Sequence, residues 1–398
     1  MQSILLVINA GSSSIKFALF EADSLACLHR GQVAGINRGS VSHFTVSDQA
    51  SGKRIVDREI TASTHQQALQ TILNWLLKHK TDFSLLAAGH RVVHGGNDYI
   101  APVAIDLNVL DNLQQLIPLA PLHQPHNLAA IHALKSLQPD LPQVACFDTA
   151  FHHTQPETAK RLALPKDVYD EGVRNYGFHG LSYEYIASVL SDYSPEAANG
   201  RTVVAHLGQG ASLCAMFKGK SVATTMTFTP LDGLPMGTRC GSIDPAVVLY
   251  LLREKKLSVD AVSDLLHHQS GLLGLSGISG DMKTLLDSRH PDAQQAIDVF
   301  VYRIIRELGA MIATIQGLDS LVFTAGIGEH SHLIREKICQ GLAWLGVELD
   351  TEANKRSDAK ISTNYSPISV WVIPTNEEKM IASQTSTLTL GGDNEQRH

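Results

Sequence analysis

ILLVINAGSSSIKFALF, residues 4–20, is the stretch from which the fold of this chain can be worked out. Its first five residues are apolar and rich in branched side chains, and turn-forming residues follow them, which is typical of a buried strand. A second strand-like segment, residues 15–20, leaves the turn. The stretch therefore predicts a β-hairpin whose tip, residues 9–14, carries several hydroxyl groups.

The tip of this hairpin has the parts that a phosphate-binding loop needs. Gly11 lets backbone N–H groups approach an anion, three serines follow it, Lys16 adds a cation, and Asn9 can orient a hydrated metal ion. An ordinary hairpin turn would contain the same residue types, because Gly and Ser are common in turns. No helix and no Gly-Lys-Ser/Thr sequence follows, so the loop is not of the Walker A type.

A second copy of the pattern favours the phosphate interpretation. Residues 202–217, TVVAHLGQGASLCAMF, again place a Gly-rich turn between two apolar segments. With one gap, residues 11–15 align with residues 210–213. Two such hairpins, about half a chain apart, predict two similar domains that face one nucleotide.

Composition limits the class of protein. At roughly 100–200 residues per domain, 398 residues predict two or three domains. The 44% hydrophobic and 18% charged residues are ordinary for a soluble globular protein, and the net charge of −7 argues against a nucleic-acid partner. No apolar run approaches the roughly 18–20 residues of a membrane span, so no membrane partner is expected. The five cysteines show no disulfide or zinc spacing, which predicts reduced thiols in the cytoplasm.

Local patterns predict the remaining elements. Apolar periodicity indicates helices over residues 65–80, 107–117, 126–137, 246–254, 259–267, 292–316 and 377–384. Strands are expected over residues 32–37, 42–46, 54–60, 85–89, 144–147, 321–324 and 368–373. Residues 228–245 and 269–280 are rich in Gly, Pro or Ser and are expected to be loops.

Several polar residues lie where chemistry is possible. Arg91 follows a predicted strand, where its planar fork suits a carboxylate or phosphate, although a surface ion pair fits equally. Asp148 ends another strand, where open α/β sheets place functional carboxylates, but a turn or cap aspartate is commoner. His179 and Arg239 each lie in a loop beside glycines, and either alone is more often a surface residue. A metal site is not favoured at the histidine pairs 152–153, in a predicted strand, or 123 and 126, in a Pro-rich loop.

The chain resembles the acetate kinase family of the acetate and sugar kinase, heat-shock chaperone and actin superfamily, from residue 4 to about residue 382. The motifs that carry the resemblance are NAGSSSIK, GHRVVHGG, FDTAFH, YGFHG, HLGQGAS, FTPLDGLPMGTRCGSIDP, FTAGIGEHS and PTNEE. The resemblance implies an α/β fold of two ribonuclease H-like (actin-like ATPase) domains, with mixed sheets flanked by helices and the active site in the interdomain cleft. The N-terminal domain would span residues 1–148 and include the C-terminal segment 377–390, and the nucleotide-binding domain would span residues 149–376.

The resemblance also implies a reaction. It is the reversible, in-line transfer of the γ-phosphoryl group of ATP to acetate, giving acetyl phosphate and ADP, with Mg²⁺ as the metal ion and Mn²⁺ as a possible substitute. A homodimer is expected on the same ground. No cysteine, serine or histidine has the pattern of a partnered nucleophile, which agrees with direct transfer. The alternatives are a kinase for propionate or another short-chain acid, and a nucleotide-switched binding protein on the same fold.

By resemblance, Arg91 binds the substrate carboxyl group, Asp148 contacts the substrate or metal, and His179 and Arg239 hold the transferring phosphoryl group. The acyl pocket would be formed by Val93, Leu122, Phe178 and Pro230, for each of which core packing is the alternative. Because Val93 is stiff and would close the end of this pocket, acetate is expected to be preferred over propionate.

The metal-associated residues implied by the resemblance are Asn9 and Glu377, although an acid in the first turn of a helix also stabilises the helix dipole. The implied nucleotide-binding residues are Ser12, Lys16, His206, Leu207, Gly208, Gln209, Gly210, Asp281, Met282, Lys283, Gly326, Ile327, Gly328, Glu329 and His330.

The chain departs from the family pattern at seven positions, and none of them is a proposed catalytic residue. The departures are Leu181 for Thr, Tyr183 for His, Gln209 for Asn, Cys240 for Ser, Ser242 for Asp, Lys283 for Arg and His330 for Asn. Most lie near the expected nucleotide, so they bear on nucleotide preference more than on the reaction.

Overall fold

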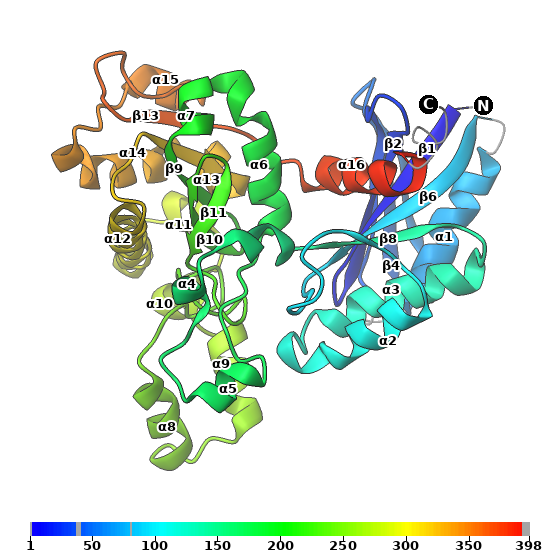
Figure 1. The fold of residues 1–398 in the computed structure, drawn as a ribbon, viewed down its shortest axis with the longest axis horizontal. Coiled ribbons are helices and arrows are strands. Elements are labelled where there is room, and N and C mark those ends of the chain that lie inside the picture. The colour runs from blue at the N-terminus through cyan, green and yellow to red at the C-terminus, as the bar shows by residue number, and fades with distance from the viewer. Residues whose placement is uncertain (1, 37–40, 80–81, 392–398) are drawn as a thin grey trace. The chain divides into compact units, whose positions relative to one another are not determined.

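The computed structural model describes residues 2–36, 41–79 and 82–391. The chain folds into two compact units, of which the first contains Met1–Phe151 with Asn376–His398 and the second contains His152–Thr375. Each unit is built on one sheet flanked by helices (Figure 1). Both sheets contain parallel and antiparallel pairs, which confirms the predicted α/β fold with mixed sheets.

The sheet of unit 1 runs in the order β5-β4-β3-β2-β1-β6-β8-β7 in the described residues. The hairpin predicted from residues 4–20 is confirmed, because β1 and β2 are antiparallel, with Asn9 opposite Lys16. β1 is parallel to β6, and β6 is parallel to β8. The strands are β1 (Gln2–Ala10), β2 (Ser14–Glu21), β3 (Cys27–Ala34), β4 (Ser42–Asp48), β5 (Arg54–Ile60), β6 (Phe83–Val92), β7 (Val103–Ala104) and β8 (Gln143–Phe147).

Helices cover both faces of this sheet because β1 is apolar on both. Ile4, Leu6 and Ile8 share a core with residues of α1 (His65–Lys78) and α3 (Gln124–Leu137). The intervening Leu5 packs with Ala87 and with Leu390 at the end of α16 (Glu377–Leu390). This alternation is the period of two that a strand imposes. Unit 1 also contains α2 (Leu107–Gln115) and the 3-10 helix η1 (Ile117–Leu119).

The C-terminal helix α16 lies directly on β6 and β1, where it is drawn in red in Figure 1. A methyl group on Gly89 of β6 would clash with Oγ1 of Thr385 and would lie 2.6 Å from Cγ2 of Ile381. Thr385 and Ile381 are both buried. Glycine at position 89 is therefore what allows the helix to approach the strand so closely.

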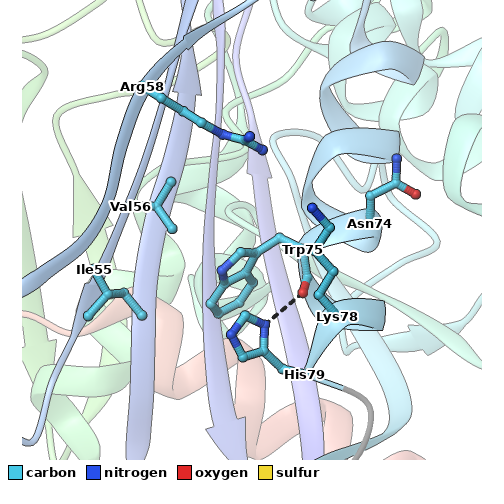
Figure 2. Close-up of a pocket in the computed structure, with 7 residues that line it drawn as sticks. All are labelled: Ile55, Val56, Arg58, Asn74, Trp75, Lys78 and His79. Carbon is cyan, nitrogen blue, oxygen red and sulfur yellow. Dashed lines mark hydrogen bonds between the residues drawn. The ribbon is translucent and has the colours of Figure 1, made fainter.

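A groove of about 350 Å³ lies between β5 and α1 (Figure 2). The indole of Trp75 is mostly buried beneath it, with its ring 6.3 Å from that of Phe17. His79 closes the end of α1 by donating a hydrogen bond from Nδ1 to the carbonyl of Trp75, at 2.8 Å. The groove is lined by Ile55, Val56, Arg58, Asn74, Trp75, Lys78 and His79.

The sheet of unit 2 runs in the order β11-β10-β9-β12-β13 in the described residues. The second predicted hairpin is confirmed as the antiparallel pair β9 and β10, with Leu207 opposite Ala211, and β12 is parallel to both β9 and β13. The strands are β9 (Arg201–Leu207), β10 (Ala211–Phe217), β11 (Lys220–Thr224), β12 (Ser320–Thr324) and β13 (Ser369–Val372).

The helices of unit 2 include α12, which packs against the sheet, as predicted for the longest apolar stripe. In the part of the chain that the structure describes, no helix is long and apolar enough to cross a membrane. The helices are α4 (Glu157–Lys160), α5 (Lys166–Asp170), α6 (Gly180–Tyr193), α7 (Pro195–Asn199), α8 (Pro245–Arg253), α9 (Val259–His268), α10 (Gly271–Ser276), α11 (Met282–Asp287), α12 (Pro291–Thr314), α13 (Ala325–His330), α14 (His332–Gly341) and α15 (Thr351–Arg356), with the 3-10 helix η3 (Ala343–Leu345). The 3-10 helix η2 (Ala150–Thr154) begins in unit 1 and ends in unit 2.

Some predicted elements were wrong in type or extent. Residues 269–280 were expected to be a loop but contain α10, because burial of Leu272 overrides the low helix propensity of the glycines. The strand predicted over residues 32–37 is instead β3, which begins at Cys27 and ends at Ala34, and Asn37 lies outside the described residues. Likewise, α1 ends at Lys78, and Lys80 lies outside the described residues.

Candidate active site

Arg91 and Asp148 form a two-point ion pair in unit 1. Nε of Arg91 donates to Oδ1 of Asp148 at 2.9 Å, and Nη2 donates to Oδ2 at 2.6 Å. Arg91 was expected in a loop, but it is the second-last residue of β6 and lies opposite Cys146 of β8, so the sheet fixes its backbone. Asp148 occupies the Nε and Nη2 edge of the guanidinium, so the donors that face another anion are those of Nη1 and the second N–H of Nη2.

Negative groups stabilise the positive charge of Arg91. Burial opposes the positive charge, but Asp148 and then Glu377 raise the pKa of Arg91 above its ordinary value. The next acid, Glu378, pairs with Nε of Arg30 at 2.7 Å, and burial raises the pKa of Glu378. Glu378 is therefore held in a structural ion pair, whereas the negative charge of Glu377 stabilises the positive charge of Arg91.

The donor set of unit 1 fits a metal ion held mainly through water. No group of three or more His, Cys, Asp or Glu side chains that could hold a metal occurs among the described residues. Asn9 is the second-last residue of β1, at the start of the tip of the first hairpin, and the charge of Glu377 acts on Arg91. One carboxylate and one amide oxygen suit Mg²⁺, which keeps several of its waters. His152 lies in η2 and His126 in α3, so neither histidine pair has the predicted local structure.

The four predicted acyl-pocket residues differ in burial. Val93 directly follows β6 and is 5% exposed, and its N–H donates to Oδ1 of Asn127 at 3.0 Å. Leu122, ahead of α3 in the same unit, is 41% exposed and is therefore not a core residue. Phe178, 1% exposed, and Pro230 belong to unit 2. Exposure thus argues against core packing for Leu122 and is compatible with it for Val93 and Phe178.

His179 is held in a defined orientation in unit 2. It precedes α6 with a φ of 57°, and its Nδ1 lies 2.8 Å from Oγ of Ser212. The hydroxyl of Tyr183 lies 2.5 Å from the same Oγ, and the ring of His179 stacks on that of His206, with centroids 4.2 Å apart. Ser212 and His206 both belong to the second hairpin, so the hairpin itself sets the orientation of the imidazole.

Arg239 and His179 meet at the Gly-rich turn of the second hairpin, residues 208–212, which we call the second phosphate-type loop; the tip of the first hairpin, residues 9–14, is the first. A methyl group on Gly210 would lie 2.7 Å from Nη2 of Arg239 and 3.1 Å from Nε2 of His179. Nη1 of Arg239 donates to the carbonyl of Pro230 at 2.6 Å, which holds the guanidinium in place. Three segments distant in sequence therefore converge inside one unit, and only glycine at position 210 leaves room for them.

The departure at Gln209 is accommodated by its neighbours. The carbonyl of Gln209 accepts from the N–H of Gly237 at 3.3 Å. A methyl group on Gly237 would lie 2.6 Å from Oε1 of Gln209, so glycine at position 237 makes space for the longer amide side chain.

Five of the implied nucleotide-binding residues, Gly326, Ile327, Gly328, Glu329 and His330, lie in α13, which follows β12. The side chain of Glu329 is used structurally, because Oε1 accepts from the N–H groups of Ala325 at 2.8 Å and Thr375 at 3.1 Å. Asp281 caps α11 by accepting from the N–H of Thr284 at 2.8 Å. Among the predicted nucleotide residues, the buried ones are His206, Leu207, Met282 and Gly328, and the exposed ones are Ser12, Lys16, Gln209, Asp281, Lys283, Gly326 and His330.

Sequence reasoning missed the residues that support these loops. Arg335 is fully buried in α14 and donates from Nη1 to the carbonyls of Gly328 and Glu329, each at 2.8 Å. Its position three and four residues before Ile338 and Cys339, on the apolar side of the helix, was a usable signal. His152 was considered only as a metal ligand, whereas its Nε2 donates to the carbonyl of Phe178 at 2.9 Å.

Acid should destabilise the protein in part through His152. Burial lowers the pKa of His152 to about 4, although its hydrogen bond to the Phe178 carbonyl partly opposes this. The unfolded chain binds this proton near the ordinary value of 6.5. The unfolded state therefore takes up more protons between these values, and stability falls as the pH falls from 6.5 to 4. The free energy of unfolding of His152→Gln should change less steeply with pH in this window than that of the wild type, because about one fewer proton is taken up on unfolding.

The measurement is urea unfolding at several pH values in this window, for both proteins. His90 and His94 are also buried, with pKa values lowered to about 4, so only the difference between the two proteins isolates His152. The same pH dependence in both proteins would show that His152 does not titrate as its burial implies.

Known proteins resemble the chain over nearly its whole length. The family model described as Acetokinase family matches residues 4–383. An acetate kinase of Rhodopseudomonas palustris is 51% identical over 401 residues, covering 98% of this chain and 100% of that protein. An acetate kinase of Methylocella silvestris is 50% identical, covering 98% of each.

Solved structures give the same result. A propionate kinase from Francisella tularensis matches with a TM-score of 0.91 at 35% identity, covering 97% of this chain and 99% of that one. An acetate kinase from Porphyromonas gingivalis matches with a TM-score of 0.89 at 37% identity, with the same coverage.

Proposed function

Because the chain belongs to the acetokinase family, whose members are phosphotransferases with a carboxyl group as acceptor, we propose that it transfers the γ-phosphoryl group of ATP to acetate. The products are acetyl phosphate and ADP, the reaction is reversible, and Mg²⁺ is the metal ion. The proposal assigns unit 1 to the predicted domain of residues 1–148 and 377–390, and unit 2 to the nucleotide-binding domain of residues 149–376.

The observation that best supports this proposal is the convergence of Gly210, His179 and Arg239. A transferring phosphoryl group spreads its charge over three equatorial oxygens, so catalysis requires fixed donors around it. Nη2 of Arg239 lies against Gly210 of the second phosphate-type loop, and Nη1 donates to the carbonyl of Pro230. Arg239 therefore needs little reorganisation to donate to the transferring group.

The contacts of His179 specify how it would act. If Nε2 carries the proton that is donated to a phosphoryl oxygen, Nδ1 must accept from the hydroxyl of Ser212. The oxygen of Ser212 then accepts from the hydroxyl of Tyr183. This chain of donors is consistent with the tautomer that transfer needs. Tyr183, a departure from the family pattern, thereby supports the proposed role of His179.

In unit 1, Arg91 binds the carboxylate of acetate, and Asp148 orients Arg91 by occupying its other edge. Asn9 and Glu377 would hold Mg²⁺ largely through water. A metal ion held there would supply positive charge to offset that of the phosphate oxygens. The Arg91–Asp148 pair fixes the acceptor oxygen for in-line attack, and no covalent intermediate on the protein is required.

We also propose a cytoplasmic homodimer. The support for the dimer is α8, which has no buried residue although its sequence, PAVVLYLLR, is largely apolar. Val247, Leu249 and Tyr250 are 43%, 47% and 51% exposed, a pattern that fits burial against a second copy. The support for the cytoplasm is that the five cysteines, all within the described residues, form no disulfide.

A single assay tests the proposed reaction. The protein is incubated with magnesium ATP and acetate, and any acyl phosphate is trapped with hydroxylamine as a hydroxamate. We expect hydroxamate to form in proportion to ADP. ADP formation without hydroxamate would contradict the kinase and would favour a nucleotide-switched protein on the same fold.

Acetate should be preferred over propionate by roughly 10–200-fold in kcat/KM, the range that one methylene gives in an apolar pocket. The similarity to a propionate kinase makes propionate the main alternative substrate. Val93 is buried two residues after Arg91, and its branched side chain cannot rotate away to admit a longer acid. Val93→Ala should therefore raise kcat/KM for propionate relative to acetate and leave phosphoryl transfer largely intact.

The measurement is kcat/KM for both acids in both proteins, with thermal unfolding as the control for stability. A loss of stability with an unchanged ratio would show that Val93 only packs at the strand end. A wild-type preference for propionate would also refute the pocket assignment.

A further inference from the structure

One buried side chain joins the two segments of unit 1 that the proposed function uses. Asn127 lies in the first turns of α3 and is 3% exposed. Its Nδ2 donates to the carbonyl of Ala10 at 2.9 Å, and its Oδ1 accepts from the N–H of Val93 at 3.0 Å. Because one partner is an acceptor and the other a donor, only one orientation of the amide satisfies both.

The position of Asn127 coincides with the point where two strands separate. β1 and β6 are paired in parallel up to Ile8 and His90, and the recorded pairing stops there. Ala10 and Val93 lie beyond that point, at the carboxyl ends of the strands, where open α/β sheets bind ligands. The amide of Asn127 donates to one segment and accepts from the other, as a peptide group of an intervening strand would.

Two neighbouring side chains each hold only one of these segments. Nε2 of His65 donates to the carbonyl of Gly11 at 2.8 Å, so His65 holds the first phosphate-type loop. Gln124 accepts from the N–H of His94 at 3.3 Å and donates to its carbonyl at 3.1 Å. Gln124 therefore holds the segment of Val93 and His94 that follows β6, which we call the acyl segment. Both side chains are buried or nearly so.

We propose that Asn127 is a positioning residue that sets the distance between the first phosphate-type loop and the acyl segment. The inference rests on the proposed function, because it assumes that these segments hold the phosphoryl donor and the carboxylate. Transfer requires the attacking oxygen and the phosphorus to approach within about 3–3.5 Å, and a displacement of about 1 Å can cost on the order of 100-fold in rate.

The test compares three buried replacements in the full-length protein. Asn127→Leu keeps the approximate shape and removes both hydrogen bonds, His65→Phe removes the contact with the loop, and Gln124→Met removes the contacts with the acyl segment. Measurements are kcat, KM for ATP and KM for acetate, with thermal unfolding for each variant. Equilibrium binding of ADP gives a readout that is independent of the acyl substrate.

We expect Asn127→Leu to lower kcat on the order of 100-fold while both KM values change only several-fold. His65→Phe should raise chiefly KM for ATP and weaken ADP binding, and Gln124→Met should raise chiefly KM for acetate. A kcat for Asn127→Leu within about threefold of wild type, with only stability lost, would overturn the proposal. So would a change confined to one of the two KM values.

A second variant keeps the test decisive if Asn127→Leu fails to fold. Asn127→Asp retains the acceptor for the N–H of Val93 but faces the carbonyl of Ala10 with an oxygen instead of a donor. It should lower kcat and weaken ADP binding, with KM for acetate within about twofold of wild type; unchanged kcat and ADP binding would overturn the proposal. Hydroxamate formation by the wild-type protein is measured first, so failure of the proposed function is seen separately from failure of this inference.

Discussion

Replacing Arg239 with alanine should lower kcat by roughly a hundredfold to a thousandfold, the usual cost of losing one donor to a charged transition state. KM for acetate should change little, because the contact forms mainly as charge develops on the transferring group. The guanidinium is already held by the Pro230 carbonyl and lies against Gly210, beside His179. Steady-state kinetics at saturating ATP measure the effect.

Two further variants make the interpretation specific. Arg239→Lys keeps the charge but loses the planar fork, so it should recover only part of the lost rate. Arg356→Ala is the matched control, because Arg356 is an exposed arginine of the same unit, paired with Asp358, and should leave kcat unchanged. Near-normal kcat with a large increase in KM for Arg239→Ala would show that Arg239 binds the ground state instead.

Replacing Arg335 with methionine should lower the free energy of unfolding on the order of 4 kcal/mol, because buried acceptors left unpaired cost about 1–3 kcal/mol each. Arg335 is fully buried, and burial lowers its pKa to about 10. Its guanidinium donates to the carbonyls of Gly328 and Glu329, to Oδ1 and the carbonyl of Asn354, and to Oγ of Ser357. Among the described contacts of Arg335 there is no carboxylate. The acceptors compensate its positive charge instead, and two of them, the carbonyls of Gly328 and Glu329, lie near the C-terminal end of α13.

Urea unfolding and ADP binding together test this prediction. Arg335→Lys keeps the charge but offers fewer donors in a different geometry, so its stability should lie between those of wild type and Arg335→Met. ADP binding by Arg335→Met should weaken, because Arg335 donates to the carbonyl of Gly328, one of the nucleotide-binding residues that the family resemblance implies. A loss of stability below about 1 kcal/mol would mean that water or a relaxed helix replaces the bonds of Arg335.

Short-range patterns predicted much of this structure. Both hairpins, the strand that precedes Asp148 and the helices with clear apolar stripes depend on neighbours within a few residues, and these predictions were confirmed. The site roles assigned to Arg91, Asp148, His179 and Arg239 stay predictions. The geometry adds that these residues form contacts within their own units.

The supports of the site could not be predicted in the same way. Asn127 binds Ala10 across 117 positions, and His65 binds Gly11 across 54, so no local pattern connects them. The error at Arg91 has a related cause, because its place in β6 depends on pairing with β8, more than fifty residues away. The error at residues 269–280 arose because composition was given more weight than burial of Leu272.

The return of α16 to unit 1 has a consequence for synthesis on the ribosome. β1 and β6 emerge early, but the helix that covers Leu5 and Ala87 and packs on Gly89 is made only after residue 376. At roughly 5–20 residues per second, translation from the end of β8 to α16 takes on the order of ten to fifty seconds. During that time an apolar face of the nascent sheet lacks its own cover and is available to chaperones. Glu377, a proposed metal-binding residue, is also absent from the nascent chain until this helix is translated.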